Sequence, residues 1–166
     1  MTKSTVKALF RPLTKHHLRD TGIICTVFSA LALIVGASTS LFQFEIAPPH
    51  QILRTAFIAF VFPALLEELV FRGPLIYLAN RKSKRLLHVT ILSLALFILW
   101  HPLNAWLLLT DTRPVFLDWR FLTLAALLGV CATTLALRTR SLWPPILFHW
   151  LAVVSWKAFL GAPAFL

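Results

Sequence analysis

The sequence predicts an all-α protein, a polytopic bundle of about five transmembrane helices. Hydrophobic residues make up 58% of the 166-residue chain, and the mean hydropathy is +0.80. Soluble globular chains are typically about 45–50% apolar. In addition, apolar stretches recur at lengths near the ~20 residues that a helix needs to cross the hydrocarbon core of a bilayer. These two observations indicate a membrane protein.

We expect a single transmembrane domain over residues 23–166, preceded by a basic arm over residues 1–22 that lies on anionic lipid. The predicted spans cover residues 23–42, 51–79, 86–109, 120–138 and 142–160. Gly73-Pro74 should kink the second span near its end, and Pro102 should interrupt the third, because proline removes a backbone donor. Two stripes of small residues should form packing faces, namely Ala32, Gly36 and Ser40 in the first span and Ala125, Gly129 and Thr133 in the fourth.

The net charge of +10 follows from the loops between the predicted spans rather than from a nucleic-acid surface. Five Lys and Arg residues lie in the arm, four in the 81–85 loop and two in the 138–140 turn. The other side carries only Arg54, Arg113, Arg120 and Lys157, if Arg72 is taken as buried. Cytoplasmic loops carry the excess of positive charge. We therefore expect a cytoplasmic amino terminus and no nucleic-acid partner.

Three ionisable residues, Glu67, Glu68 and Arg72, lie inside an apolar segment. A charge at bilayer depth costs at least ~2.5 kcal/mol, so these side chains must face protein or trapped water. Residues four apart share one face of a helix, so Glu68 and Arg72 can form an ion pair. Glu67 is rotated away by about 100° and is the freer carboxylate. It is our candidate for a general base, and a purely structural polar clasp is the alternative interpretation.

Two histidines in other predicted spans, His101 and His149, indicate a site that converges with this stretch. Asn104 follows His101 by three residues and could share its face, either in catalysis or in a hydrogen bond between helices. Two glutamates and two histidines could also bind zinc. The chain has no H-E-x-x-H sequence, which leaves zinc as the weaker alternative.

At these residues the sequence resembles the CAAX-protease and bacteriocin-processing (Abi-type) family of intramembrane proteases, which includes type II CAAX prenyl endopeptidases. Glu67-Glu68-Leu69-Val70-Phe71-Arg72 is similar to the family's E-E-x-x-x-R block, and Phe97-Ile98-Leu99-Trp100-His101 to its F-x-x-x-H block. His149 fits the histidine that opens the third block. The resemblance covers roughly residues 51–160.

The resemblance implies a glutamate-dependent protease of the bacterial cytoplasmic membrane that cleaves a lipidated or membrane-anchored peptide or protein. Carried over, Glu67 and His101 activate a water, Glu68 and Arg72 hold the arrangement, and His149 serves the oxyanion. The resemblance also implies that water is activated without a metal or other cofactor. The third block commonly has a polar residue four positions after its histidine, where this chain has Val153. Asn104 is our candidate substitute.

Two questions stay open at this point. A homo-oligomer or a membrane partner could complete the cavity of so short a chain. The alternative function is a non-catalytic accessory or immunity protein that binds a membrane partner through the same polar cavity, and Val153 favours it.

Overall fold

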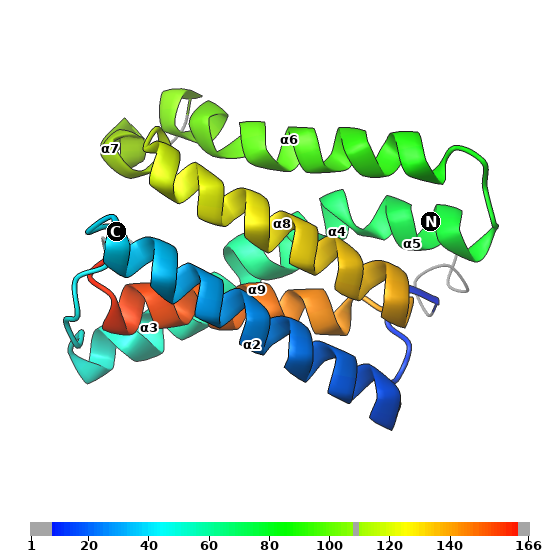
Figure 1. Cartoon of the computed structure of the whole chain (residues 1–166), viewed down its shortest axis with the longest axis horizontal. Helices are drawn as coiled ribbons and strands as arrows, with labels where there is room; N and C mark the ends of the chain where they lie inside the picture. Colours follow the sequence, from blue (N-terminus) through cyan, green and yellow to red (C-terminus); the bar gives the residue numbers. More distant parts are fainter. Residues whose placement is uncertain (1–7, 108–109, 163–166) are drawn as a thin grey trace.

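Helices build the described part of the chain, residues 8–107 and 110–162, in the computed structural model (Figure 1). The prediction of an all-α membrane protein is confirmed. In chain order the elements are α2 (Lys15–Ser38), α3 (Pro49–Ala59), the π-helical turn η1 (Phe60–Leu65), α4 (Leu66–Phe71), α5 (Gly73–Asn80), α6 (Leu86–Leu107), η2 (Thr110–Thr112), α7 (Arg113–Phe116), α8 (Trp119–Thr139) and α9 (Trp143–Phe159).

Helix α8 is central, because it packs against α2, α6 and α9 and lies between α2 and α6 in Figure 1. The small residues Ala125, Gly129 and Thr133 of α8 are all buried, as a packing face requires. In α2 the corresponding Ala32 and Gly36 are buried, whereas Ser40 lies beyond the end of the helix and is exposed. One apolar core joins four helices through Phe28, Ala32, Phe97, Leu128, Ala132, Leu135 and Phe148.

Three helices, α2, α6 and α8, are long and apolar enough to cross a membrane. The chain is therefore an integral membrane protein. Helix α9 is 17 residues long, and the segment predicted as the second span is divided into shorter helices. The count of five spans stays a prediction.

The segment 51–79 is divided into shorter helices, at the predicted Gly73-Pro74 and at a second position. The predicted kink lies between α4 and α5, at Arg72, directly before Gly73-Pro74. A second break, which we did not predict, lies in η1, where Phe62 leaves the helical region at φ −126° and ψ 113°. Pro63 causes this break, because proline has no N–H to donate and restricts the residue before it to extended conformations. The short helix α4, which carries both glutamates, therefore has a break on each side.

The predicted interruption at His101-Pro102 is wrong, because α6 continues through Pro102 to Leu107. Proline is tolerated in membrane helices where neighbouring groups satisfy the backbone that it frees. Here Pro102 leaves the carbonyl of Ile98, three residues before His101, without its helical donor. The proline therefore keeps the helix and frees an acceptor beside the histidine.

The segments before and after α2 form backbone hydrogen bonds with residues at the two ends of α9. At one end the backbone N–H of Leu142 donates to the carbonyl of Leu9 at 2.8 Å. At the other end, segment 43–47 donates three backbone N–H groups to the carbonyls of residues 158–160 at 2.9–3.2 Å. These carbonyls terminate α9 and have no donor of their own helix, so the segment caps them.

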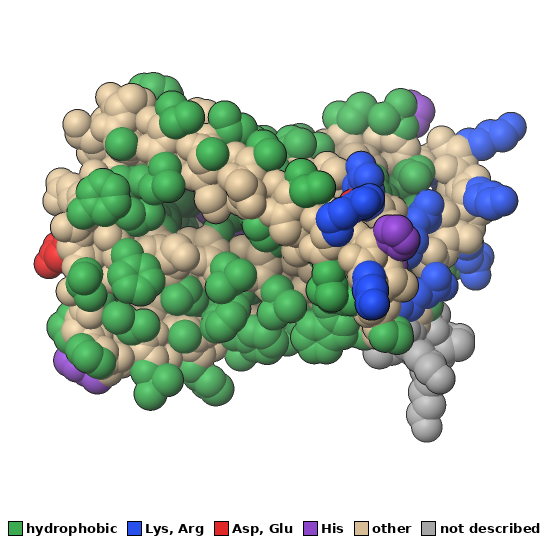
Figure 2. Space-filling view, turned by 60° about the horizontal axis from the view of Figure 1, so that its bottom comes forward, with side chains coloured by type: hydrophobic (Ala, Val, Ile, Leu, Met, Phe, Trp, Pro, Cys, Tyr) green, Lys and Arg blue, Asp and Glu red, His purple; other side chains and the backbone are tan. Residues whose placement is uncertain are grey.

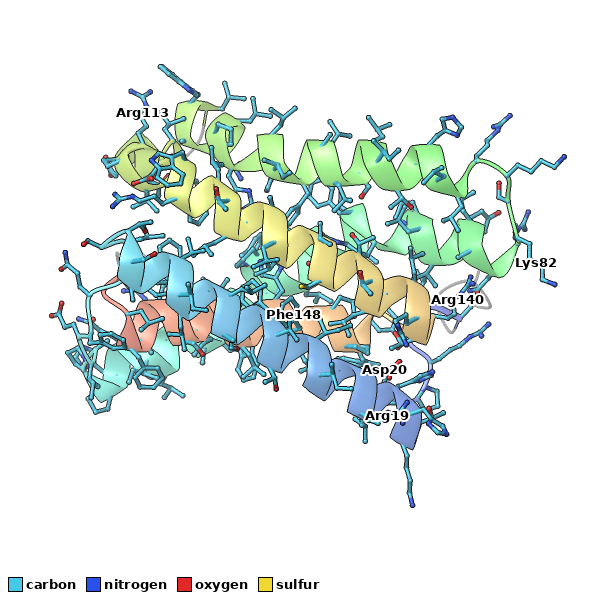
Figure 3. The ribbon with its side chains drawn as sticks, viewed as in Figure 1. Arg19, Asp20, Lys82, Arg113, Arg140 and Phe148 are labelled. Atoms are coloured by element: carbon cyan, nitrogen blue, oxygen red, sulfur yellow. The ribbon has the colours of Figure 1, made fainter. Side chains whose placement is uncertain are left out.

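Lysines and arginines gather at one end of the molecule (Figure 2). Arg19, Lys82 and Arg140 lie at that end, whereas Arg113 lies at the other (Figure 3). The predicted basic arm, loop and turn therefore come together, in agreement with the counting that places the amino terminus in the cytoplasm. Helix α2 begins at Lys15, inside the predicted arm, and residues 1–7 of that arm lie outside the described residues.

Candidate active site

Glu68, Arg72 and His149 form a buried charged cluster between α4 and α9. Oε1 of Glu68 lies 2.8 Å from Nδ1 of His149 and 3.3 Å from an Nη atom of Arg72. Glu68 and Arg72 are completely buried and His149 nearly so. The predicted i,i+4 pair is present, at ion-pair distance but without hydrogen-bond geometry between its two members. A carboxylate can only accept, so Nδ1 of His149 is the donor to Glu68.

Arg72 also reaches the backbone of α8. Its Nη2 donates to the carbonyl of Gly129 at 3.1 Å, and its guanidinium carbon lies 4.1 Å from the centroid of the Phe97 ring. A Cβ on Gly129 would lie 3.0 Å from that ring and 3.5 Å from Arg72. Glycine at this position therefore lets the arginine and the phenylalanine approach α8 closely.

Glu67 lies apart from this cluster, as the 100° rotation predicted. Its Oε1 accepts a hydrogen bond of 3.0 Å from the indole Nε1 of Trp100. Its Oε2 is buried and has no hydrogen-bond partner among the described residues. Glu67 is thus a carboxylate held by one donor, with its second oxygen unpaired.

His101 is buried on the face of α6 that also carries Phe97 and Asn104. Its Nδ1 lies 3.0 Å from the carbonyl oxygen of Phe97. Because a carbonyl only accepts, this nitrogen carries the proton, and Nε2 of the neutral ring is an acceptor. The edge of Phe121 packs against the ring with centroids 5.2 Å apart, which fixes the ring plane. The imidazole is therefore oriented as a base.

Both histidines line a cavity of about 460 Å³ between α2, α6, α8 and α9. The remaining walls are mainly apolar, and their members include Phe28, Leu128, Phe148, Val153 and Trp156. The cavity lies beside Phe148, which Figure 3 shows between α2 and α9 near the middle of the bundle. Since the Nδ1 atom of each imidazole is engaged, its Nε2 is the nitrogen available to a molecule in the cavity.

The six candidate residues thus fall into groups. Glu68, Arg72 and His149 are in contact with one another, and His101 shares the cavity with His149. No hydrogen bond joins Glu67 to His101 in residues 8–107 and 110–162. Asn104 is buried on the face of α6 that carries His101, as predicted, but its side-chain amide makes no hydrogen bond with the described residues.

The described residues contain no group of three or more His, Cys, Asp or Glu side chains that could hold a metal ion. The two glutamates and two histidines are therefore not gathered as a zinc site would require. The expectation that the protein works without a metal stays a prediction.

Sequence reasoning missed some of the contacts that hold this site. The hydrogen bond from Trp100 to Glu67 was not foreseen, because a contact between helices leaves no local spacing to detect. The carbonyl of Gly129 was also missed, although the small-residue stripe marked that part of α8 for close approach. Acid–base chemistry is what buried carboxylates and two oriented imidazoles beside a cavity can perform.

The comparison with known families gives a match over the region that contains the site. The model of the family described as "Type II CAAX prenyl endopeptidase Rce1-like" matches residues 49–155, more than half of the chain. The match contains the glutamates, the arginine, both site histidines and Asn104, whereas α2 lies before it. Comparisons with the curated proteins and with the solved structures find no match.

Proposed function

The chain belongs to this family of type II CAAX prenyl endopeptidases, which points to a membrane protease, and we propose that it hydrolyses a peptide bond through a water activated by Glu67 and His101. The substrate is a lipidated or membrane-anchored peptide or protein, and the reaction takes place in the bacterial cytoplasmic membrane. The observation that carries the proposal is the pair of imidazoles, each anchored through Nδ1, in one cavity beside buried carboxylates.

In the proposed reaction, the water lies between the carboxylate of Glu67 and Nε2 of His101. The unpaired Oε2 of Glu67 and the acceptor Nε2 of His101 support these roles, because each can take a proton from water. The hydroxide attacks the carbonyl carbon, and the proton later passes to the leaving amine. Trp100 orients Glu67 through its indole N–H.

Glu68 and Arg72 are positioning residues in this proposal. Glu68 orients His149 through Nδ1, and Arg72 offsets the buried charge of Glu68. His149 can donate to an oxyanion through Nε2 only as an imidazolium, since its Nδ1 already donates to Glu68. Asn104 is a second candidate donor, because its side-chain amide makes no hydrogen bond with the described residues and lies on the face of α6 that carries His101.

The size and the apolar walls of the cavity support a hydrophobic substrate. A prenylated peptide is our first choice, because the family is described as a prenyl endopeptidase. A homo-oligomer or membrane partner stays a second hypothesis for the part of the substrate that lies outside the cavity.

The test compares membrane-protein processing in cells that make the wild type or the Glu67→Gln variant, which keeps the shape of the side chain and removes the base. Lys84→Met is the matched control, because Lys84 is exposed in the basic loop. We expect at least one membrane substrate to accumulate uncleaved with Glu67→Gln and to be processed in the control. Identical processing at equal protein levels would reject the protease and favour the non-catalytic accessory protein that Val153 suggests.

A further inference from the structure

The cavity beside the two site histidines opens to the surface between α2 and α9. Four of its lining residues are exposed, namely Ser29 and Leu33 of α2 and Leu151 and Ser155 of α9. Leu33 is 45% exposed and Leu151 is 51% exposed. The lining residues that α6 and α8 contribute are instead buried or half-buried. These four exposed residues therefore frame the opening, which we call the mouth of the cavity.

Contacts between the two helices close the mouth at both of its ends. At one end the ring of Phe28 packs edge-on against that of Phe148, with centroids 4.9 Å apart, and Figure 3 places Phe148 where α2 and α9 cross. At the other end, the segment 43–47 that follows α2 is hydrogen-bonded to residues 158–160. Along α9, residues 148 and 158 are about 15 Å apart at a rise of 1.5 Å per residue. The mouth is therefore a slot about 15 Å high.

The mouth faces the hydrocarbon of the bilayer. Helix α2 is one of the helices long and apolar enough to cross a membrane. Beside the mouth, α2 exposes Leu31 and Ile34, and α9 exposes Leu147 and Phe159. Exposed apolar side chains gathered in this way mark a surface that contacts lipid. A ligand that passes the mouth therefore enters the cavity sideways from the membrane.

The height of the mouth decides which kind of hydrophobic group can enter. A helix that spans the hydrocarbon core is about 30 Å long, so it cannot pass sideways into a slot about 15 Å high that is closed at both ends. A single aliphatic chain has no such restriction. The cavity volume of about 460 Å³ also lies in the range of about 300–1,000 Å³ that is usual for small ligands. The mouth therefore selects lipid chains over transmembrane helices.

We propose that the mouth binds the lipid chain of a lipidated substrate, and that this chain runs from the site histidines between α2 and α9 into the bilayer. The inference rests on the proposed protease function and narrows its substrates from membrane-anchored to lipid-anchored peptides. It gives a substrate-binding role to α2, which lies before the matched region 49–155. Because the far end of the chain lies in lipid, the cavity does not measure its length. Farnesyl and geranylgeranyl chains should therefore bind alike.

The first experiment measures hydrolysis of an internally quenched peptide that ends in a prenylated Cys-aliphatic-aliphatic-X sequence, with purified protein in nanodiscs. Ser29→Trp places a large ring in the mouth at an exposed position, where it does not disturb the core. We expect KM to rise about tenfold for both the farnesylated and the geranylgeranylated peptide, with kcat nearly unchanged, because the chain is bound equally in the ground state and in the transition state.

The matched control is Ala30→Trp. Ala30 is also small and exposed on α2, but it points about 100° away from Ser29 and does not line the cavity. This variant should keep the KM of the wild type for both peptides. An unchanged KM in a folded Ser29→Trp variant would overturn the inference. A KM that differs tenfold or more between the two chain lengths in the wild type would also overturn it, since the chain would then end inside the cavity.

The second experiment separates this inference from the proposed function, because its readout does not need hydrolysis. The farnesylated peptide carries a photoreactive diazirine on its isoprenoid and is irradiated with the Glu67→Gln variant in nanodiscs. Mass spectrometry then locates the labelled residues. We expect label on residues 29–33 and 151–155, and its loss when unmodified farnesylated peptide is added in excess.

The outcomes distinguish the two proposals. Label at the mouth without hydrolysis by the wild type would reject the protease but keep the mouth as a binding site for lipid chains. Hydrolysis with label on other helix faces would overturn only the role of the mouth. Label at the mouth that excess peptide does not remove would also overturn that role, because any chain of the bilayer would then occupy it. The absence of both hydrolysis and label would overturn both proposals for prenylated peptides.

Discussion

The buried pair of Glu68 and Arg72 should behave as one unit in unfolding experiments. The Arg72→Met variant removes the guanidinium that lies 3.3 Å from Glu68 and donates to Gly129, and it leaves the Glu68 carboxylate buried with His149 as its remaining partner. Loss of one member of a buried ion pair typically costs about 3–5 kcal/mol. We expect a loss of this size for Arg72→Met.

The Glu68→Gln variant should lose less free energy of unfolding than Arg72→Met, toward the lower end of the same range of about 3–5 kcal/mol. Arg72 would keep its hydrogen bond to the carbonyl of Gly129 and its contact with the Phe97 ring. In the double variant neither charge is left behind. Its loss should therefore fall short of the sum of the two single losses by about 2–3 kcal/mol, the upper part of the range for residues in contact.

The assay is reversible unfolding in mixed micelles of a mild detergent and sodium dodecyl sulfate, followed by far-ultraviolet circular dichroism. Lys84→Met removes an exposed basic charge from the 81–85 loop and should change the free energy of unfolding by no more than about 0.5 kcal/mol. If the two single losses add in the double variant, the pair contributes no coupling. The assignment of Arg72 as the counter-ion of Glu68 would then be refuted.

Three other changes have defined outcomes. Trp100→Phe removes the donor to Glu67 and should lower kcat for hydrolysis of a farnesylated peptide about tenfold while the protein stays folded. An unchanged kcat would mean that the hydrogen bond does not orient the base. Gly129→Ala places a methyl group 3.0 Å from the Phe97 ring and should destabilise the protein by about 1–3 kcal/mol in detergent unfolding. Gly22→Ala, where no atom lies within 4 Å, is its control and should not destabilise. The hydrogen bond from Arg120 holds the pKa of Asp118 below its usual value. The stability that the Asp118 carboxylate contributes is therefore present at neutral pH. It is lost as the pH falls below about 3.9, the pKa in the unfolded chain, and through the lower pKa of the folded protein. The difference in unfolding free energy between the wild type and Asp118→Asn should therefore shrink in acid, and a difference that is independent of pH would contradict this cause.

Most of the fold could be predicted because the hydrophobic pattern encodes it. The last two predicted spans, 120–138 and 142–160, differ from α8 and α9 by a residue or so at each end. The errors lie at prolines, whose effect depends on their surroundings. Pro63 ends a helix and Pro102 does not, and the sequence around each is similarly apolar. What decides between them is whether neighbouring groups compensate for the missing donor, which only the packed structure reveals.

The candidate site was predictable where it is local in sequence. The i,i+4 spacing of Glu68 and Arg72 and the rotation of Glu67 away from them follow from helical geometry alone. The contacts made across helices, from Trp100 to Glu67 and from Glu68 to His149, could not be read in the same way. They depend on the rotation of each helix about its axis, which packing determines.

The backbone hydrogen bonds on both sides of α2 have a consequence for the synthesis of the protein. Chains emerge and insert from the amino terminus, so α2 enters the membrane before its partners near residues 142 and 158–160 exist. Until α9 is translated, three backbone N–H groups of segment 43–47 lack their acceptors. Helix α2, which forms one wall of the cavity, is then not bonded on either side. The site is therefore complete only after α9 has been translated, since α9 follows the other helices that line the cavity. A ribosome that stalls before α9 would leave the cavity without the wall that carries His149.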